Sequence, residues 1–206
     1  MTDHFARLDV NRQPWLDVEE LKGRFHTLSQ EVHPDRVHNA SPAERETANA
    51  QYSSLNTAYN TLRQPKDRIA HLIELETGVR PRDIQGMSTD LADLFLKVGA
   101  VLKEIDPLVA QKESTVSPML KVALMDRVMV ASDRLETVQR EVGGLVQALD
   151  QELKSMNTAW IHAPDLGQSG RREALPLARL EEMYRLLGYY TRWQQQLSDR
   201  LFRLSL

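Results

Sequence analysis

The chain has 206 residues, of which 41% are hydrophobic and 27% charged, ordinary values for a globular protein of one domain or two small ones. Its net charge of −3 excludes a chain built as a whole to bind nucleic acid, because such binding needs a basic surface. The absence of cysteine excludes a disulfide framework, thiolate zinc sites and cysteine-held iron–sulfur clusters.

The start of the chain and its hydropathy predict a compartment. Residues 1–5 lack the basic and apolar regions of a signal peptide. No apolar run approaches the roughly 18 residues that would suggest a membrane span. We therefore expect a cytoplasmic protein.

A helix is predicted over residues 17–32. Its apolar residues recur at i, i+4, i+7 and i+11, which is the spacing of one helical face. Pro34 ends the helix, because a proline pushes the residue before it out of the helical region. The apolar stripe consists of Leu21, Phe25, Leu28 and Val32.

A second helix of similar length is predicted over residues 41–63. It opens with Ser41-Pro42-Ala43-Glu44, a capping box with proline at the first helical position. The two helices are joined by residues 33–40, so they should pack as an antiparallel hairpin. The apolar stripe of the second helix consists of Ala48, Tyr52, Leu55, Tyr59 and Leu62.

The rest of the chain also has helical periodicity. A short helix over residues 65–76 is followed by Gly78 as its expected C-cap, and residues 78–88 have the composition of a linker. One helix is then expected to end at Pro107, and a long one begins at Ser117. The inner face of the long helix is expected to contain Leu120, Leu124, Val128, Ala131, Leu135, Val138 and Val142.

Two glycines and a polar loop divide the last part of the chain. Gly143 and Gly144 are expected to weaken the long helix, each by about 1 kcal/mol relative to alanine. A loop over about 164–176 precedes a last helix from Leu177 to about Leu204. The predicted fold is all-α, with an N-terminal helical hairpin and a C-terminal antiparallel bundle of three helices.

An H-x-D-x-x-H pattern, His33, Asp35 and His38, has the residue types of a metal site. A metal needs three or four ligands that converge on one point, whereas side chains of a turn splay apart. A hydrolase dyad of His33 and Asp35 lacks a serine or cysteine nucleophile in a recognisable elbow, and no glycine-rich phosphate loop is present. We therefore expect no enzymatic activity, no cofactor and no metal.

A binding role has a better physical basis for this loop. Pro34 fixes its own φ, so the polar groups of His33 and Asp35 lose little entropy when a partner docks. Lys22, Arg24 and Arg36 are the nearby cations that would meet an acidic surface and speed the encounter. In isolation the tripeptide is more often a plain turn between helices, but the matched stripes on both sides favour the binding interpretation.

Three motifs surround the tripeptide: Phe5-x-x-Leu8, then Arg24-Phe25-x-x-Leu28, and Asn56-x-Ala58-Tyr59-x-x-Leu62-Arg63-x-Pro65 followed by Arg68 and Gly78. They resemble the HscB family of J-domain co-chaperones of iron–sulfur cluster biogenesis, which includes mitochondrial Jac-type members. The Gly/Phe-rich region and CxxC zinc domain of general DnaJ proteins do not occur in this sequence. The resemblance covers nearly the whole length.

The resemblance implies a J domain over residues 1–77, a linker over 78–88 and a client-binding helical bundle over 89–206. It implies that His33, Pro34 and Asp35, with Lys22, Arg24 and Arg36 beside them, contact a DnaK/HscA-type chaperone and stimulate its ATPase. It also implies that the bundle binds an IscU-type scaffold. Nucleic acid and membrane are not expected partners.

The client-binding positions of that family match this chain poorly. An alignment on residues 102–105 places Ala92, Asp93, Leu96, Lys97 and Ala100 where the family has leucine, methionine and acidic residues. The predicted client-binding residues are Leu96, Glu104, Leu186 and Tyr189. The apolar residues 94, 95, 96 and 98 are expected mostly in the bundle core.

The sequence leaves three other interpretations open. The first is a J protein that recruits the chaperone to a different client. The second is a helical interaction protein that has lost chaperone contact, and the third is a metal-dependent hydrolase. An intact His33-Pro34-Asp35 turn argues against the second. The sequence names neither the cognate chaperone nor the oligomeric state.

Overall fold

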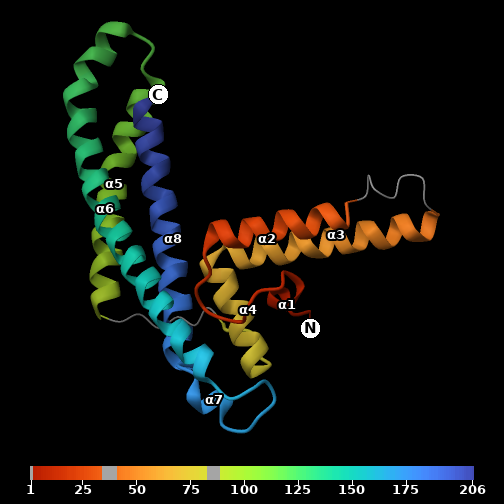
Figure 1. Ribbon diagram of the computed structural model, residues 1–206. Coiled ribbons are helices and arrows are strands. Elements are labelled where there is room, and N and C mark those ends of the chain that lie inside the picture. Colours follow the sequence, from red (N-terminus) through yellow and green to blue (C-terminus); the bar gives the residue numbers. More distant parts are fainter. Residues whose placement is uncertain (1, 34–40, 83–88) are drawn as a thin grey trace. The chain divides into compact units, whose positions relative to one another are not determined.

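The computed structural model describes residues 2–33, 41–82 and 89–206, and every regular element in these ranges is a helix (Figure 1). The predicted all-α class is therefore confirmed. None of the helices described there is long and apolar enough to cross a bilayer. The elements are α1 (His4–Arg7), α2 (Val18–Glu31), α3 (Pro42–Arg63), α4 (Pro65–Thr77), α5 (Thr89–Ser114), α6 (Pro118–His162), α7 (Arg171–Ala174) and α8 (Leu177–Ser205).

The chain forms two compact units. Unit 1 consists of Met1–Arg82 and Asp150–Tyr184, and unit 2 of Asp83–Leu149 and Arg185–Leu206. Unit 1 thus takes in residues 150–184, which the sequence analysis assigned to the C-terminal bundle. The two units are defined by contacts, whereas the predicted domains are regions that would fold on their own. The predicted domain boundaries therefore stay a prediction.

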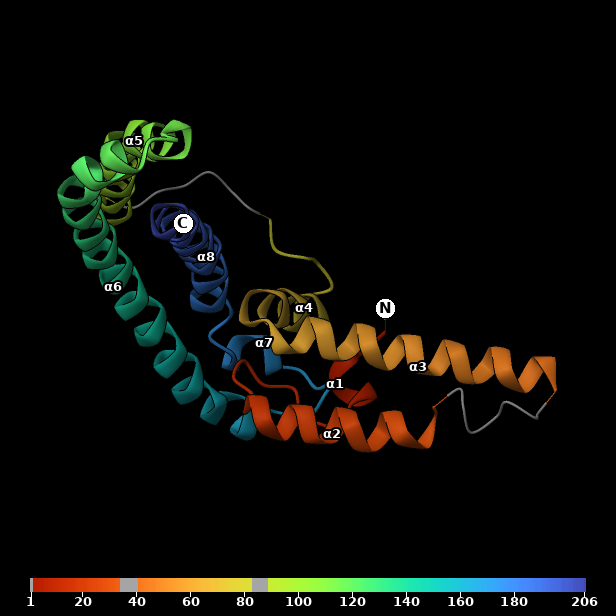
Figure 2. The ribbon, with the colours of Figure 1, turned by 90° about the horizontal axis from the view of Figure 1, so that it is seen from above.

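The α2–α3 hairpin of unit 1 has the predicted antiparallel arrangement, and Figures 1 and 2 both show the two helices side by side. Asp17 caps α2 by accepting hydrogen bonds from the backbone N–H groups of Glu19 and Glu20, at 2.9 and 3.0 Å. Ser41 and Glu44 form the predicted capping box of α3. These caps satisfy backbone groups that every helix leaves unpaired at its ends.

The packing of the hairpin follows the predicted stripes. Leu21 of α2 and Leu55 of α3 are buried. Phe25 and Tyr59 are only half-buried, and their rings stack with centroids 4.5 Å apart. The hairpin therefore has an apolar seam whose aromatic edge remains in contact with solvent.

Arg68 of α4 is the largest fully buried side chain, with 2% of its surface exposed. Its Nε donates a hydrogen bond to the Pro14 carbonyl at 2.8 Å, and its Nη1 donates to the Leu62 carbonyl at 2.7 Å. Burial lowers the pKa of Arg68 to about 10, with Asp150 opposing the shift, so the guanidinium is still charged at neutral pH. One side chain thus joins the loop before α2, the end of α3 and α4.

Polar contacts join the C-terminal part of α6 to the N-terminal segment within unit 1. The Trp15 indole donates to the Asp150 carboxylate at 3.1 Å. The Trp15 backbone N–H donates to the Asn157 side-chain oxygen, and the Asn157 amide donates back to the Trp15 carbonyl, both at 3.0 Å. These contacts bind the C-terminal part of α6 to the segment before α2 within unit 1.

The polar segment before α8 also binds to the rest of unit 1, at the C-terminal end of α4. Arg171 donates two hydrogen bonds to the buried Glu76 carboxylate, at 2.7 and 2.8 Å. The hydrogen bonds to Glu76 raise the pKa of Arg171. Arg172 donates to the backbone carbonyls of Glu76 and Thr77, at 2.8 and 3.0 Å. The two guanidinium groups thus lie where the helix dipole of α4 is negative. Gly78 caps α4 in the left-handed conformation (φ 79°), as predicted.

Unit 2 is built from α5, the first three-quarters of α6 and the later part of α8. The helix expected to end at Pro107 continues to Ser114, because Leu108 and Val109 extend its buried stripe past the one missing N–H. α6 likewise continues through Gly143 and Gly144. Most of the predicted inner face of α6 is buried, but Leu120, in the first turn of α6, is 59% exposed and Val128 is half-buried.

The central position of Arg68 leads to a first prediction. Arg68→Ala should lower the free energy of unfolding by roughly 3–5 kcal/mol, because two charge-assisted hydrogen bonds are lost and buried carbonyls stay unpaired. Urea unfolding followed by circular dichroism measures this change. The matched control is Arg80→Ala, whose ion pair with Glu74 is a 4.0 Å contact at the surface. An equal, small effect of both variants would contradict the assignment.

A buried histidine pair leads to a second prediction. The His71 Nε2 accepts a hydrogen bond from the His4 backbone N–H at 3.1 Å, so the imidazole must be unprotonated at that nitrogen. Burial, with further contributions from His4, Arg12 and Arg80 and opposition from Asp3, lowers the pKa of His71 to about 4. The unfolded chain therefore binds more protons between pH 6.5 and 4, and stability is lost as the pH falls through this window.

The measurement is the free energy of unfolding at pH 7, 6, 5 and 4. The His71 contribution has a slope of at most about 1.4 kcal/mol per pH unit. His71→Gln can still accept the His4 hydrogen bond but does not titrate, so it should flatten the curve in this window. His162→Gln, at an exposed site on α6, should not. A His71→Gln curve that parallels the parent curve would contradict the prediction.

Candidate functional site

His33 lies just beyond the C-terminal end of α2 and is half-buried. Its ring meets the ring of Tyr52 on α3 edge to face, with centroids 5.4 Å apart and an interplanar angle of 79°. Val32 closes α2 by donating its N–H to the Leu28 carbonyl at 3.4 Å. The imidazole is therefore held at the end of the hairpin by a partner from the opposite helix. Pro34, Asp35 and Arg36 lie outside the described residues.

The two predicted cations on α2 do not form one patch. Lys22 lies 3.8 Å from the Glu19 carboxylate, and Arg24 lies 3.3 Å from that of Asp9. Both side chains are more than half exposed. Two positions apart on a helix are about 200° apart around its axis, so Lys22 and Arg24 flank the buried seam on opposite sides. Surface pairs of this kind contribute little to stability and leave the charges available to a partner.

On unit 2, an aromatic cluster joins α5 to α8. The Phe95 and Trp193 ring centroids are 6.4 Å apart, and those of Tyr189 and Trp193 are 5.8 Å apart. The cluster borders a groove of about 640 Å³ between the two helices, which also exposes Gly99 and Leu102. Phe95 is 48% exposed although it is a large aromatic residue. Exposed aromatic surface beside a groove is typical of a protein-binding site.

The predicted client-binding residues are divided between different surroundings. Leu96 is 66% exposed on α5. Glu104 forms an ion pair with Arg134 of α6. Leu186 and Tyr189 are half-buried on α8. Only Tyr189 belongs to the aromatic cluster.

The expectation that residues 94, 95, 96 and 98 lie mostly in the core is half wrong. Leu94 and Val98 are buried, but Phe95 and Leu96 are exposed. Apolar residues occur in four consecutive turns of α5, so the sequence pattern does not show which of them face inward. It therefore could not distinguish the exposed Phe95 from its buried neighbours. Trp193, one turn after Tyr189, is the residue that the sequence analysis missed, and the spacing of four was the available signal.

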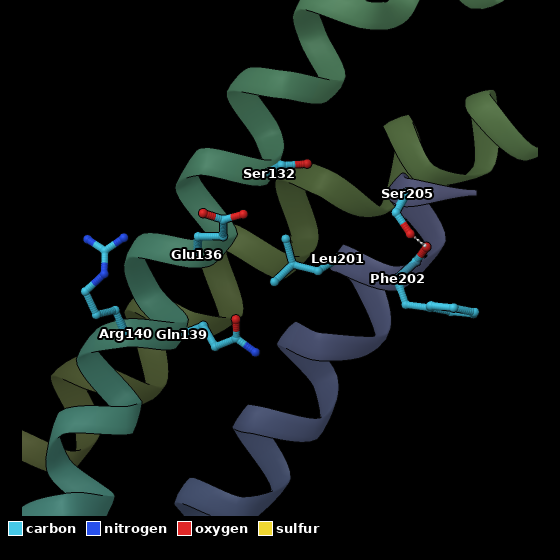
Figure 3. A pocket seen from close by; sticks show the side chains of 7 residues that line it. All are labelled: Ser132, Glu136, Gln139, Arg140, Leu201, Phe202 and Ser205. Atoms are coloured by element: carbon cyan, nitrogen blue, oxygen red, sulfur yellow. Dashed lines mark hydrogen bonds between the residues drawn. The ribbon is translucent and has the colours of Figure 1, made fainter.

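A second hollow of about 630 Å³ lies between α6 and α8 and has a more polar lining (Figure 3). Its lining includes Glu136, Gln139 and Arg140 of α6 and Leu201 and Phe202 of α8; Gln139 extends toward α8, whereas Arg140 points away from it (Figure 3). Among the residues that the structure describes, no three histidine, aspartate or glutamate side chains are grouped to hold a metal. The predicted pattern of His33, Asp35 and His38 lies partly outside those residues.

Residues 3–71 match the DnaJ domain family, a span that begins just before α1 and ends within α4. The fold is similar to that of human co-chaperone protein HscB, with a TM-score of 0.62 and 17% identity over 97% of this chain and 82% of that one. It is also similar to chaperone HscB from Vibrio cholerae, with a TM-score of 0.58 and 18% identity over 96% of each chain.

The chain contains a DnaJ domain and has the HscB fold. The matched span of the J domain contains α1, α2, α3 and the first half of α4. It therefore includes His33 and Tyr52, both α2 cations and the buried Arg68. The aromatic groove of α5 and α8 lies outside it.

Proposed function

We propose that this J-domain co-chaperone stimulates the ATPase of a DnaK/HscA-type chaperone through His33, Pro34 and Asp35, and delivers an IscU-type scaffold on its C-terminal helices. The observation that carries the proposal is a DnaJ domain match whose hairpin ends at His33, with the imidazole held against Tyr52. The HscB fold of the chain supports the choice of client.

The hairpin suits a docking role because its end is preorganised. The ring contact with Tyr52 restricts the rotamers of His33 before binding, so less entropy is lost when a chaperone docks. Lys22 and Arg24, on the two flanks of α2, would attract an acidic surface of the chaperone. Exposed charges of this kind mainly raise the association rate, and salt screens them.

The client would bind at the groove between α5 and α8. Phe95 and Trp193 offer a rigid aromatic anchor of the type that dominates protein interfaces. Tyr189 extends this surface along α8. The Glu104 carboxylate is already paired with Arg134, so it would contribute to the rim rather than to the centre.

A different client is the second candidate, and the residues of α5 favour it. The family's leucine, methionine and acidic positions on this helix are occupied by Ala92, Asp93, Leu96, Lys97 and Ala100, of which only Leu96 keeps its type. Lys97 is paired with Glu141. An interface that selects its partner by charge would therefore select a different one here.

The position of Tyr52 leads to a third prediction. Tyr52→Ala should reduce the stimulated ATPase rate at subsaturating co-chaperone by roughly 2- to 10-fold, since an aromatic pair contributes about 0.5–1.5 kcal/mol. Tyr52→Phe keeps the ring and should retain the stimulation. Steady-state hydrolysis over a range of co-chaperone concentrations, with circular dichroism to verify folding, measures both. Equal loss in the two variants would show that the hydroxyl, not the ring, matters.

The fourth prediction tests the proposal as a whole. His33→Gln should abolish stimulation of a DnaK- or HscA-type ATPase and lower the free energy of unfolding by no more than about 1.5 kcal/mol, because the half-buried ring loses only its contact with Tyr52. Added IscU-type scaffold should raise the stimulation by the parent chain synergistically. Phe95→Ala should keep the basal stimulation and lose the increase given by scaffold.

The control for the client arm is Phe202→Ala, which removes an exposed phenylalanine outside the aromatic groove. It should retain the scaffold effect. Stimulation that needs His33 but ignores scaffold would favour a different client. No stimulation of either chaperone would count against the proposal.

A further inference from the structure

The outward face of α6 in unit 2 carries exposed methionines. Met119, Val122, Met125 and Met129 are each 62–83% exposed. They lie on the side of the helix opposite to the buried residues Leu124, Ala131 and Leu135. A surface helix normally has polar residues on this side, so a row of large apolar residues there indicates a contact surface.

Three carboxylates continue the same face. Asp126, Asp133 and Glu136 follow Met119, Val122 and Met129 at the spacing of three and four that keeps residues on one side of a helix. All three are exposed. Arg140, one turn beyond Glu136, is the first cation on this line (Figure 3). The face is therefore apolar and acidic over residues 119–136.

These carboxylates differ from most of the other acids of unit 2. Glu104, Asp106, Glu113 and Glu141 are paired with arginine or lysine side chains. No ion pair within the described part of the chain involves Asp126, Asp133 or Glu136. The basic residues nearest in sequence, Arg127 and Arg134, turn instead toward Gln111 and Glu104 of α5. The negative charge of this face is therefore left for a partner to neutralise.

We propose that this methionine–acid face of α6, residues 119–136, binds a basic amphipathic helix of a partner protein. Methionine side chains are flexible and polarizable, so they adapt to apolar residues of different shape. A helix with apolar residues at i, i+3, i+4 and i+7 would cover the methionines. Lysine or arginine on its flanks would meet the three carboxylates. This surface is separate from the aromatic groove and from the hairpin end, and its role does not depend on the function proposed above.

The probe is an 18-residue fluorescein-labelled peptide of leucine and lysine that is amphipathic as a helix. Two comparison peptides have the same composition in scrambled order, or glutamate in place of lysine. Fluorescence anisotropy with the full chain should give binding of the leucine–lysine helix. Affinity should be at least 10-fold weaker for the glutamate and scrambled peptides. It should also fall as sodium chloride is raised from 50 to 500 mM, because salt screens the charge pairing.

Two sets of variants separate the apolar and the charged contributions. Met125→Gln with Met129→Gln should weaken binding by about 10-fold. Asp126→Asn, Asp133→Asn and Glu136→Gln together should weaken it and remove most of its salt dependence. The matched controls are Ile161→Gln, an exposed apolar residue elsewhere on α6, and Asp93→Asn, an exposed acid on α5. Neither control should change the affinity, and circular dichroism checks that every variant is folded.

Three results would overturn the proposal. Equal affinity for the lysine and glutamate peptides would remove the charge argument. Unchanged binding in both variant sets would place the peptide elsewhere. Sedimentation equilibrium that shows a dimer of the parent chain, lost in the Met125 and Met129 variant, would make a second copy of the chain the occupant of this face.

Discussion

The J domain of this chain depends on one buried guanidinium. Pro65 cannot continue the hydrogen bonding of α3, so the helix ends and the Leu62 carbonyl loses its helical partner. Arg68, one turn into α4, donates to that carbonyl and at the same time to the Pro14 carbonyl. A lysine has no fork with which to reach two acceptors in fixed directions. The angle between α3 and α4 and the path of the loop before α2 are thus set by the same side chain.

The charge of that guanidinium has a consequence for the rest of unit 1. Among the described residues no carboxylate forms an ion pair with it, and Asp150 of α6 is the acid whose field acts on it. The same carboxylate accepts the Trp15 indole hydrogen bond, next to Pro14. α6 is therefore bound where the J domain has its buried positive charge, and Arg171 binds the end of α4 in a similar way. The end of the hairpin that carries His33 takes part in none of these contacts.

The sequence predicted the helices well and the long-range contacts poorly, for a physical reason. Apolar stripes, helix-capping residues and Gly78 depend on local geometry. The α2–α3 hairpin, α4 and the start of α8 could therefore be predicted from them. The hydrogen bonds that join residues 150–184 to the rest of unit 1 involve isolated residues such as Trp15, Asn157 and Glu76, which belong to no periodic pattern. His33 was found because a turn motif is local, whereas the aromatic groove depends on two helices almost 100 residues apart in sequence. At Pro107, the burial of apolar residues beyond the proline stabilises α5 by more than the loss of one backbone hydrogen bond destabilises it, so the helix continues.

The two surfaces that we assign to partners on unit 2 differ in how they would recognise them. Phe95, Tyr189 and Trp193 are rigid rings that contact one another, so the shape of the groove exists before a partner arrives. Such a surface favours one client over others. The methionines of α6 have flexible side chains, and no ion pair within the described residues involves the neighbouring carboxylates, so we expect that face to discriminate by charge and amphipathicity rather than by shape. If both proposals hold, the chain would bind one defined partner at the groove while the α6 face accepts helices of varied sequence.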